Sequence, residues 1–369
     1  MTAIDPATYD QQLQEKVADL ETRFQGLELP PLDTYASAPL NYRMRAEFKI
    51  WQQDGRADYA MYRQGEHRKA YIIESFPAGS STIAALMPPL LEQINQCDIL
   101  RQRLFSVEFL TTLSGEAVIT LLYHRPLDEV WEERAKAVAA HMNTDIIGRS
   151  RKQKVVIGRD YVIEKLEVDG RTYSYQQKET GFTQPNARVN EKMLDWARQH
   201  STNFGGDLLE LYCGNGNFTA VLAQNFQRVL ATEIAKISVH SAIYNFEANK
   251  IDNIEIVRLS SEEITQALNE VRPFRRLRHI DLKSYQFSTV FVDPPRAGLD
   301  DDTVELLRRF DNIIYISCNP ETLHANLLAL DSSHSIEHFA AFDQFPYTHH
   351  LEAGAVLKKR LPHESNQAE

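Results

Sequence analysis

The chain has 369 residues, of which 43% are hydrophobic and 25% are charged, a composition typical of a soluble globular protein with two or three domains. Its net charge of −11 argues against a protein that binds polyanions through overall charge. The sequence has no apolar run long enough to span a membrane, and Met1–Lys16 lacks the apolar core of a signal peptide. We therefore expect a cytoplasmic protein.

The three cysteines, Cys97, Cys213 and Cys318, lie far apart and show no CxxC spacing. This spacing argues against a disulfide framework, a zinc site and an iron–sulfur cluster, and it favours a reducing compartment. Basic residues concentrate in two runs, Gly148–Arg159 and Arg272–Lys283. Each run could hold phosphate groups locally, although a solvated face without a partner would look the same.

The first part of the chain, residues 1–175, is predicted to be an antiparallel α+β region. An amphipathic helix is expected first, then a proline-rich linker, then short alternating strands that include a hairpin around Ser114-Gly115. The predicted helices are Asp5–Phe24, Ser80–Gln96 and Trp131–Met142, and the linker is Leu27–Pro39. The predicted strands are Tyr42–Trp51, Ala57–Tyr62, Ala70–Ile73, Leu104–Leu113, Ala117–His124, Asp145–Arg149 and Lys154–Ile157. No catalytic constellation stands out here.

The second part, residues 176–369, alternates apolar strands with helical stretches. Such alternation predicts an α/β domain with a mostly parallel, doubly wound sheet. A polar tail is expected from Leu361 to Glu369. The predicted strands are Asp207–Tyr212, Arg228–Thr232, Asn253–Leu259, Ser288–Val292 and Asn312–Ser317, with Ile336–Phe342 and Ala353–Leu357 supplying the rest.

A glycine-rich turn follows the first of these strands. Gly214 and Gly216 permit a tight turn and a close approach of a ligand to the backbone. Glu233 ends the next strand about 20 residues on, where an acid commonly binds ribose hydroxyls. Thr219 stands where a dinucleotide motif would have its third glycine, and no P-loop lysine follows. The pattern favours a nucleoside cofactor, with S-adenosylmethionine as the obvious one.

The fourth strand runs into Asp293-Pro-Pro-Arg296. Asp293 is expected at the carboxyl edge of the sheet, beside the glycine turn. Methyltransferases that act on amino groups carry an aromatic residue where this chain has Arg296, which argues against amino-group methylation. Arg296 is predicted to bind substrate, because a guanidinium pairs with phosphate, carboxylate or carbonyl oxygens.

Cys318 directly follows the apolar strand Asn312–Ser317, which Pro320 ends. A thiol at this edge is placed to act as a nucleophile, although an isolated cysteine is more often a small core residue. A thiolate that adds to C6 of a pyrimidine turns C5 into a nucleophilic carbon, and a base must later remove the C5 proton. Glu352, just before the last strand, is the candidate base, and His349 and His350 are rivals for that role.

Five motifs together resemble the class I RNA uracil-C5 methyltransferases, and most closely the members that form ribothymidine at position 54 in the T-loop of tRNA. They are Phe182-Thr-Gln-Pro-Asn186, Leu211-Tyr-Cys-Gly-Asn-Gly-Asn217, Asp293-Pro-Pro-Arg296, Ser317-Cys-Asn-Pro320 and His349-His-Leu-Glu352. The resemblance implies a Rossmann-like methyltransferase domain preceded by an RNA-binding region. It also implies that Cys318 is the nucleophile and Glu352 the base. It implies contacts to S-adenosylmethionine from Gln184, Tyr212, Asn217, Glu233 and Asp293, and stacking of Phe182 near a flipped uracil.

One departure from the wider family bears on the substrate. The chain lacks the OB-like domain and the four-cysteine iron–sulfur motif that many ribosomal-RNA members carry, so tRNA is the expected partner. Phe105 and the basic run Arg149–Lys154 are the expected RNA contacts in the first region. Three alternatives remain open: the same reaction on ribosomal RNA, an RNA-folding module with secondary methylation, and a small-molecule or protein methyltransferase in which Cys318 is a core residue.

Overall fold

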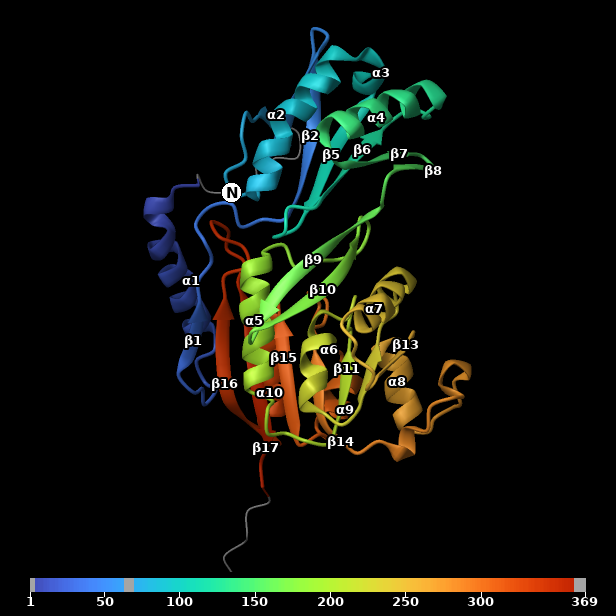
Figure 1. Cartoon of the computed structure of the whole chain (residues 1–369). Coiled ribbons are helices and arrows are strands. Elements are labelled where there is room, and N and C mark those ends of the chain that lie inside the picture. The colour runs from blue at the N-terminus through green and yellow to red at the C-terminus, as the bar shows by residue number, and fades with distance from the viewer. Residues whose placement is uncertain (1–3, 63–69, 362–369) are drawn as a thin grey trace, which may run out of the picture. The chain divides into compact units, whose positions relative to one another are not determined.

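The computed structural model describes residues 4–62 and 70–361, which form two compact units (Figure 1). Unit 1 comprises Met1–Asp10, Ser37–Glu191 and Phe345–Thr348, and unit 2 comprises Gln11–Ala36, Lys192–Gln344 and His349–Glu369. A single domain boundary near residue 175 was predicted from the sequence. Most of the predicted polar tail lies outside the described residues. No helix among the described residues has both the length and the apolar composition needed to cross a membrane.

Unit 1 is built on a seven-stranded sheet with the order β4-β3-β2-β5-β6-β7-β8. All predicted strands of this region are confirmed, but β6 and β7 pair in parallel, so the expectation of a purely antiparallel region was wrong. Helix α4 (Glu129–Met142) lies between these two strands in the chain, and a helical crossover is what parallel neighbours require. The strands are β2 (Arg45–Gln53), β3 (Arg56–Tyr62), β4 (Ala70–Ile72), β5 (Leu104–Thr111), β6 (Ala117–Tyr123), β7 (Asp145–Ser150) and β8 (Gln153–Ile157).

The helices of unit 1 cover one face of this sheet. Helices α2 (Ser81–Gln96) and α4 pack on it, and the short helix α3 (Asp98–Arg101) contacts both (Figure 1). Position 148 in β7 requires glycine, because a Cβ there would lie 2.2 Å from the ring of Trp131 in α4. Strand β2 alternates accordingly, with Phe48 buried and Trp51 exposed on the opposite face.

An antiparallel hairpin of β9 (Tyr161–Val168) and β10 (Arg171–Lys178) completes unit 1. This hairpin was not predicted from the sequence, although two signals were present. Asp169 and Gly170 both have positive φ angles, 50° and 72°, as an Asp-Gly hairpin turn requires. The residues of β9 also alternate between buried and more exposed positions. Helix α5 (Ala187–Gln199), which was not predicted either, begins in unit 1 and ends in unit 2.

Unit 2 contains the predicted doubly wound sheet, with the order β1-β16-β17-β15-β14-β11-β12-β13. Every neighbouring pair is parallel except those that β17 makes with β15 and β16. All strands predicted for this region are confirmed. They are β11 (Asp207–Leu211), β12 (Val229–Thr232), β13 (Ile254–Val257), β14 (Phe287–Val292), β15 (Asn312–Ser317), β16 (His334–Phe342) and β17 (Glu352–Lys359).

The edge strand β1 (Leu32–Tyr35) is a correction to the sequence analysis. Leu27–Pro39 was predicted to be a linker, yet its middle pairs in parallel with β16. Prolines flank the strand, and their missing N–H groups are tolerated where a strand has a partner on only one side. The linker prediction failed because such a short edge strand has no clear hydrophobic alternation.

Helices cover both faces of the sheet in unit 2. Helix α1 (Tyr9–Arg23) follows a short 3₁₀ turn capped by Asp5 and so starts later than predicted. It shares one core with α8 (Ser261–Leu268), α9 (Asp301–Leu307) and α10 (Pro320–Leu330). Helix α6 (Asn217–Leu222) lies against the sheet through Phe218, whose ring packs against that of Phe291 in β14 at a centroid distance of 4.6 Å. Helix α7 (Lys236–Ala248) follows β12.

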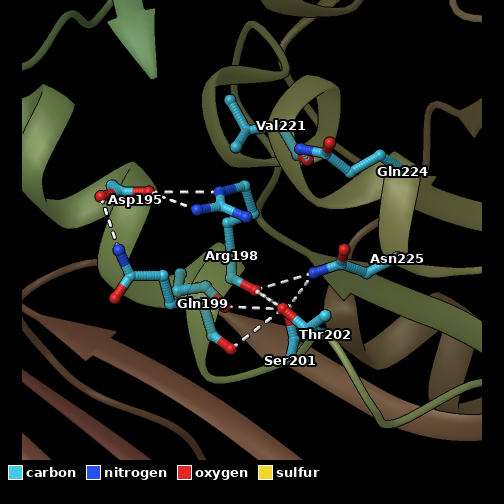
Figure 2. A network of polar contacts seen from close by, with 9 residues as sticks. Asp195, Arg198, Gln199, Ser201, Thr202, Val221, Gln224 and Asn225 are labelled. Atoms are coloured by element: carbon cyan, nitrogen blue, oxygen red, sulfur yellow. Dashed lines mark hydrogen bonds and ion pairs between the residues drawn. The ribbon is translucent and has the colours of Figure 1, made fainter. Parts of the chain in front are cut away.

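A polar network holds the end of α5 against the turn after α6 (Figure 2). Asn225 donates hydrogen bonds from its side-chain amide to the Arg198 carbonyl and the Ser201 hydroxyl, at 2.8 and 2.9 Å. The Arg198 guanidinium in turn forms an ion pair with Asp195. The network satisfies the last carbonyl groups of α5, which a helix end leaves without intrahelical partners.

Candidate functional site

The glycine turn connects β11 to α6 and has a strained, open backbone. Tyr212, Gly214 and Gly216 all have positive φ angles, 60°, 57° and 79°. A Cβ on Gly216 would lie 2.5 Å from the ring of Phe246, so that position needs glycine. A Cβ on Gly214 would meet nothing within 4 Å, so the backbone there borders open space. The turn therefore leaves room for a ligand against its backbone, and Asn217 opens the helix that follows.

Glu233 follows β12 and is tied to the glycine turn. Its carboxylate accepts hydrogen bonds from the backbone N–H of Gly214 at 3.0 Å and of Ala235 at 2.7 Å. The carboxylate is half-buried, so it has further acceptor capacity beside these two bonds. This is the position from which an acid can accept hydrogen bonds from ribose hydroxyls.

Asp293 directly follows β14, which lies between β11 and β15 in the sheet. Burial raises the pKa of its carboxyl to about 7. A second carboxyl, Glu210 in β11, is fully buried, and burial, followed by the charge of Asp293, raises its pKa to about 8. Glu210 was not among the predicted site residues, because a single acid inside an apolar strand has no motif signal of its own.

Cys318 and Glu352 come to the same edge of the sheet through the register of two antiparallel strands. Strand β15 ends at Ser317, which pairs with Ala353 of β17, and Glu352 is the first residue of β17. Cys318 follows Ser317, so the next position in this register faces Glu352. Cys318 is half-buried, and Glu352 is 4% exposed. The predicted nucleophile and the predicted base are therefore neighbours.

Burial and the charges at this edge favour the neutral thiol. Burial, and then the charges of Glu352 and Asp293, raise the pKa of Cys318 to about 11, while Arg296 acts in the opposite direction. Burial, and then Asp293, raise the pKa of Glu352 well above its ordinary value, again opposed by Arg296. Two carboxyl groups and a thiol thus share one nearby cation, a clustering of perturbed groups that is typical of active sites.

Arg296 connects the loops that carry these residues. Its guanidinium lies 3.3 Å from Nδ1 of His350, and its carbonyl accepts a hydrogen bond from the Asn319 side chain at 2.9 Å. A guanidinium can only donate, so His350 Nδ1 must accept and its proton must be on Nε2. This occupation of Nδ1 argues against His350 as the base. His349, its neighbour, is exposed, and the two rings lie 4.0 Å apart.

Unit 1 carries the other predicted site residues. Phe105 is 36% exposed, stacks on His124 with ring centroids 4.2 Å apart, and lies beneath the ammonium of Lys49. Phe182 is 73% exposed. The side-chain oxygen of Gln184 is buried and has no hydrogen-bond partner, which leaves an acceptor for a donor group of a ligand.

The predicted basic run Arg149–Lys154 is only partly available for RNA. Arg149 forms an ion pair with Glu179, and Lys154 bonds to Asp160 at 2.7 Å. Arg151 and Lys152 are exposed, and no carboxylate of the described residues lies within ion-pair distance of them. In the second run, Arg276 and Lys283 face Glu263 and Glu270. No group of three or more His, Cys, Asp or Glu side chains within 4–62 and 70–361 is arranged to hold a metal ion.

Comparison with known proteins gives consistent matches across the chain. The family model described as tRNA (Uracil-5-)-methyltransferase matches residues 8–360. A "tRNA/tmRNA (uracil-C(5))-methyltransferase" of Saccharophagus degradans is 56% identical over 96% of this chain and 98% of its own length. The protein of the same description from Pseudomonas putida strain F1 is 56% identical over 97% of this chain and 99% of its own.

A solved structure has the same fold at much lower sequence similarity. It is the tRNA (uracil-54, C5)-methyltransferase of Pyrococcus abyssi in complex with S-adenosyl-L-homocysteine, with a TM-score of 0.71. It is 21% identical to this chain and matches 95% of it and 83% of its own length. The Rossmann-like methyltransferase fold predicted from the sequence is thereby confirmed.

Proposed function

Because the chain belongs to the tRNA (uracil-5-)-methyltransferase family, we propose that it methylates C5 of uridine 54 in the T-loop of tRNA. One observation carries this proposal: the register of β15 and β17 brings a thiol and a carboxylate, Cys318 and Glu352, to one edge of the sheet. The glycine turn after β11 and Asp293 after β14 lie at the same edge. Methylation at a pyrimidine carbon needs these groups together, whereas methylation of an amine needs no thiol.

The residues around the glycine turn fit S-adenosylmethionine, which when bound supplies an electrophilic methyl group. Glu233 would hold the ribose hydroxyls, and Tyr212 and Asn217 flank the open backbone at Gly214. Gln184, which belongs to unit 1, has a buried side-chain oxygen without a hydrogen-bond partner, as expected of a residue that contacts a ligand. Asp293 would complete the set of cofactor contacts at the end of β14.

Cys318 starts the reaction as a thiolate. Its sulfur forms a bond to C6 of the uracil, and the electrons of the C5–C6 double bond move toward the C4 carbonyl, so that C5 becomes nucleophilic. Since the pKa of the free thiol is about 11, the thiol must first lose its proton. Arg296 is the cation that favours this loss, and its guanidinium can also bind the uracil carbonyl or a phosphate.

Glu352 acts in the last step, as a base in its carboxylate form. Once C5 has taken the methyl group, it carries both that group and its original proton. Glu352 removes the proton, the C5–C6 double bond forms again, and the bond between C6 and the sulfur of Cys318 breaks. The burial of Glu352, which raises its pKa, makes it a stronger base than an exposed carboxylate.

The helix-free face of the unit 1 sheet would bind the RNA at its uncovered end. Val162 of β9 packs on the other end with Leu110, Val118 and Ile147. The uncovered part presents Trp51 with the cluster of Lys49, Phe105 and His124. Aromatic rings stack on unpaired bases, and cations beside them hold the phosphate backbone, which is the usual way in which proteins recognise RNA loops. Phe182, with most of its ring exposed, is suited to stack near a base flipped out of the T-loop.

The test is release of tritium from tRNA that carries C5-tritiated uridine, incubated with the protein and S-adenosylmethionine. We expect one tritium atom released per methyl group transferred, with tRNA and an isolated T-arm hairpin both as substrates. A ribosomal RNA fragment should release none. Methyl transfer without tritium release would contradict C5 as the target, and efficient release from ribosomal RNA alone would contradict the proposed substrate.

A further inference from the structure

Helix α1 reaches the connection between β16 and β17, which leads directly into the proposed base Glu352. Strand β16 ends at Phe342, which pairs with Glu352, so Asp343 and Glu352 stand at the two ends of this connection. The ammonium of Lys16 in α1 lies 2.7 Å from Asp343 Oδ1 and donates to the His350 carbonyl at 3.0 Å. One side chain thus holds the beginning and the end of the connection together.

The Lys16 contact is buried, unlike most ion pairs of this protein. The side chains of Lys16 and Asp343 are 8% and 0% exposed. Gln12, one turn earlier in α1, adds a hydrogen bond to the other Asp343 oxygen at 3.2 Å. A buried pair with additional hydrogen bonds has a defined geometry, whereas an exposed pair is loose and contributes little.

The same clamp acts on the arginine of the site through His350. The backbone carbonyl of His350 is held by Lys16, and its ring accepts a hydrogen bond from Arg296. Burial, and then the charges of His349, Arg296 and Lys16, lower the pKa of His350, which favours the neutral ring that can accept this bond. Arg296 is in turn bonded to Asn319, next to Cys318. A continuous path therefore leads from α1 to the nucleophile.

We propose that Lys16 is a positioning residue for the reaction: by joining Asp343 to the His350 carbonyl, it holds the Glu352 carboxylate in the position from which it removes the C5 proton. This inference rests on the proposed function of Glu352. Glu352 is the last paired residue of the β16–β17 ladder, so strand pairing fixes the backbone that follows it in the chain. The clamp fixes the backbone that precedes Glu352, at His350. This matters because a displacement of about 1 Å in a catalytic group can cost roughly 100-fold in rate.

The test compares Lys16→Met with the double variant Lys16→Met/Asp343→Asn. The single variant leaves a buried carboxylate without its cation and is at risk of instability, whereas the double variant leaves no unpaired charge. Arg23→Met is the matched control, because Arg23 lies on the same helix and pairs with the exposed Asp19 and Glu321. Lys16→Arg tests whether a cation of different shape restores the clamp. All variants are checked for folding by thermal melts.

We expect kcat on T-arm RNA to fall roughly 10- to 100-fold in the double variant, with KM for RNA and Kd for S-adenosylmethionine within about twofold of wild type. A methylated RNA–protein adduct should also accumulate on denaturing gels, because thiol addition is intact and proton removal is slow. A kcat within twofold of wild type, or an equal loss in Arg23→Met, would overturn the proposal. So would a loss of kcat without adduct in a variant that melts normally.

Failure of this inference can be told apart from failure of the proposed function. If Glu352→Gln traps the adduct and the folded double variant turns over normally, Glu352 is the base and the clamp is not needed. If Glu352→Gln itself turns over normally, the base assignment is wrong, and the inference falls with it.

Discussion

Cys318 and Glu352 face each other because β17 runs antiparallel to β15. Strands β15, β14 and β11 are parallel and end at one edge of the sheet, and β17 begins at that same edge. A parallel β17 would begin at the opposite edge, and Glu352 would lie a strand length away from the thiol. The single antiparallel strand in the middle of the sheet is therefore what makes the pair possible: Glu352 is the first residue of that strand, and Cys318 directly follows the paired residue Ser317.

Replacement of the nucleophile should separate binding from chemistry. Cys318→Ala removes the sulfur that makes C5 nucleophilic, so methyl transfer should become undetectable while the melting temperature and the affinity for S-adenosylmethionine stay near wild type. Cys97→Ala, at another half-buried cysteine, is the control and should be fully active. Methylation by the Cys318 variant above the background of a mock preparation would rule out the covalent route.

Glu233 should contribute to cofactor affinity, and two substitutions at this position should weaken binding to different extents. Glu233→Ala should weaken binding of S-adenosylmethionine by roughly 1–3 kcal/mol, the scale of lost hydrogen bonds to a charged group. Glu233→Gln keeps one oxygen that can still accept from Gly214, so its loss should be smaller. Calorimetry measures both. Equal affinity of wild type and folded Glu233→Ala would mean that the ribose site lies elsewhere.

The high pKa of Cys318 predicts slow alkylation of the free protein at neutral pH. With a pKa of about 11, the thiolate is a very small fraction at pH 7 and should increase roughly tenfold per pH unit up to pH 10. The rate of iodoacetamide labelling of the Cys318 peptide, followed by mass spectrometry, should increase in step. Arg296→Met should slow labelling further, because Arg296 lowers the thiol pKa. A labelling rate that levels off below pH 8 would show that the thiol is already activated.

The raised pKa of Asp293 predicts that this residue lowers the stability of the fold at high pH. Its folded-state pKa of about 7 is above that of an unfolded chain, so the neutral acid favours folding at low pH and this contribution is lost as the pH rises through 7. Asp293→Asn should therefore melt at a higher temperature than wild type at pH 8.5, and the difference should shrink toward pH 5. A difference that is independent of pH would mean that the carboxyl is ionised throughout.

The sequence predicted the strands of unit 2 well, because buried parallel strands read as apolar runs that glycine turns and prolines interrupt. Each predicted motif of unit 2 lies where the sheet topology implies. The short edge strand β1 could not be predicted in the same way, since its partner β16 lies far away in the chain. The parallel pairing of β6 with β7 was missed although the predicted helix Trp131–Met142 lies between the two strands, as a parallel crossover requires.

The residues around the motifs were beyond sequence reasoning for a different reason. Lys16 and Asp343 are far apart in the chain, and nothing in either local sequence signals a buried ion pair. Glu210 gives no signal inside an apolar strand. The basic run at Arg149–Lys154 gave a misleading signal of an RNA contact. Glu179 and Asp160 neutralise part of this run, and both lie outside it in the sequence. The surface charge of such a run can therefore be judged only once its ion pairs are known.

The most direct test of covalent catalysis is the fate of Glu352→Gln with T-arm RNA and S-adenosylmethionine labelled in the methyl group. Glutamine keeps the size of the side chain and removes the base, so thiol addition and methyl transfer should proceed and elimination should stall. We predict a methyl-labelled RNA–protein adduct that survives denaturing gel electrophoresis and is absent from Cys318→Ala/Glu352→Gln. Turnover near the wild-type rate without an adduct would contradict the assignment of Glu352 as the base.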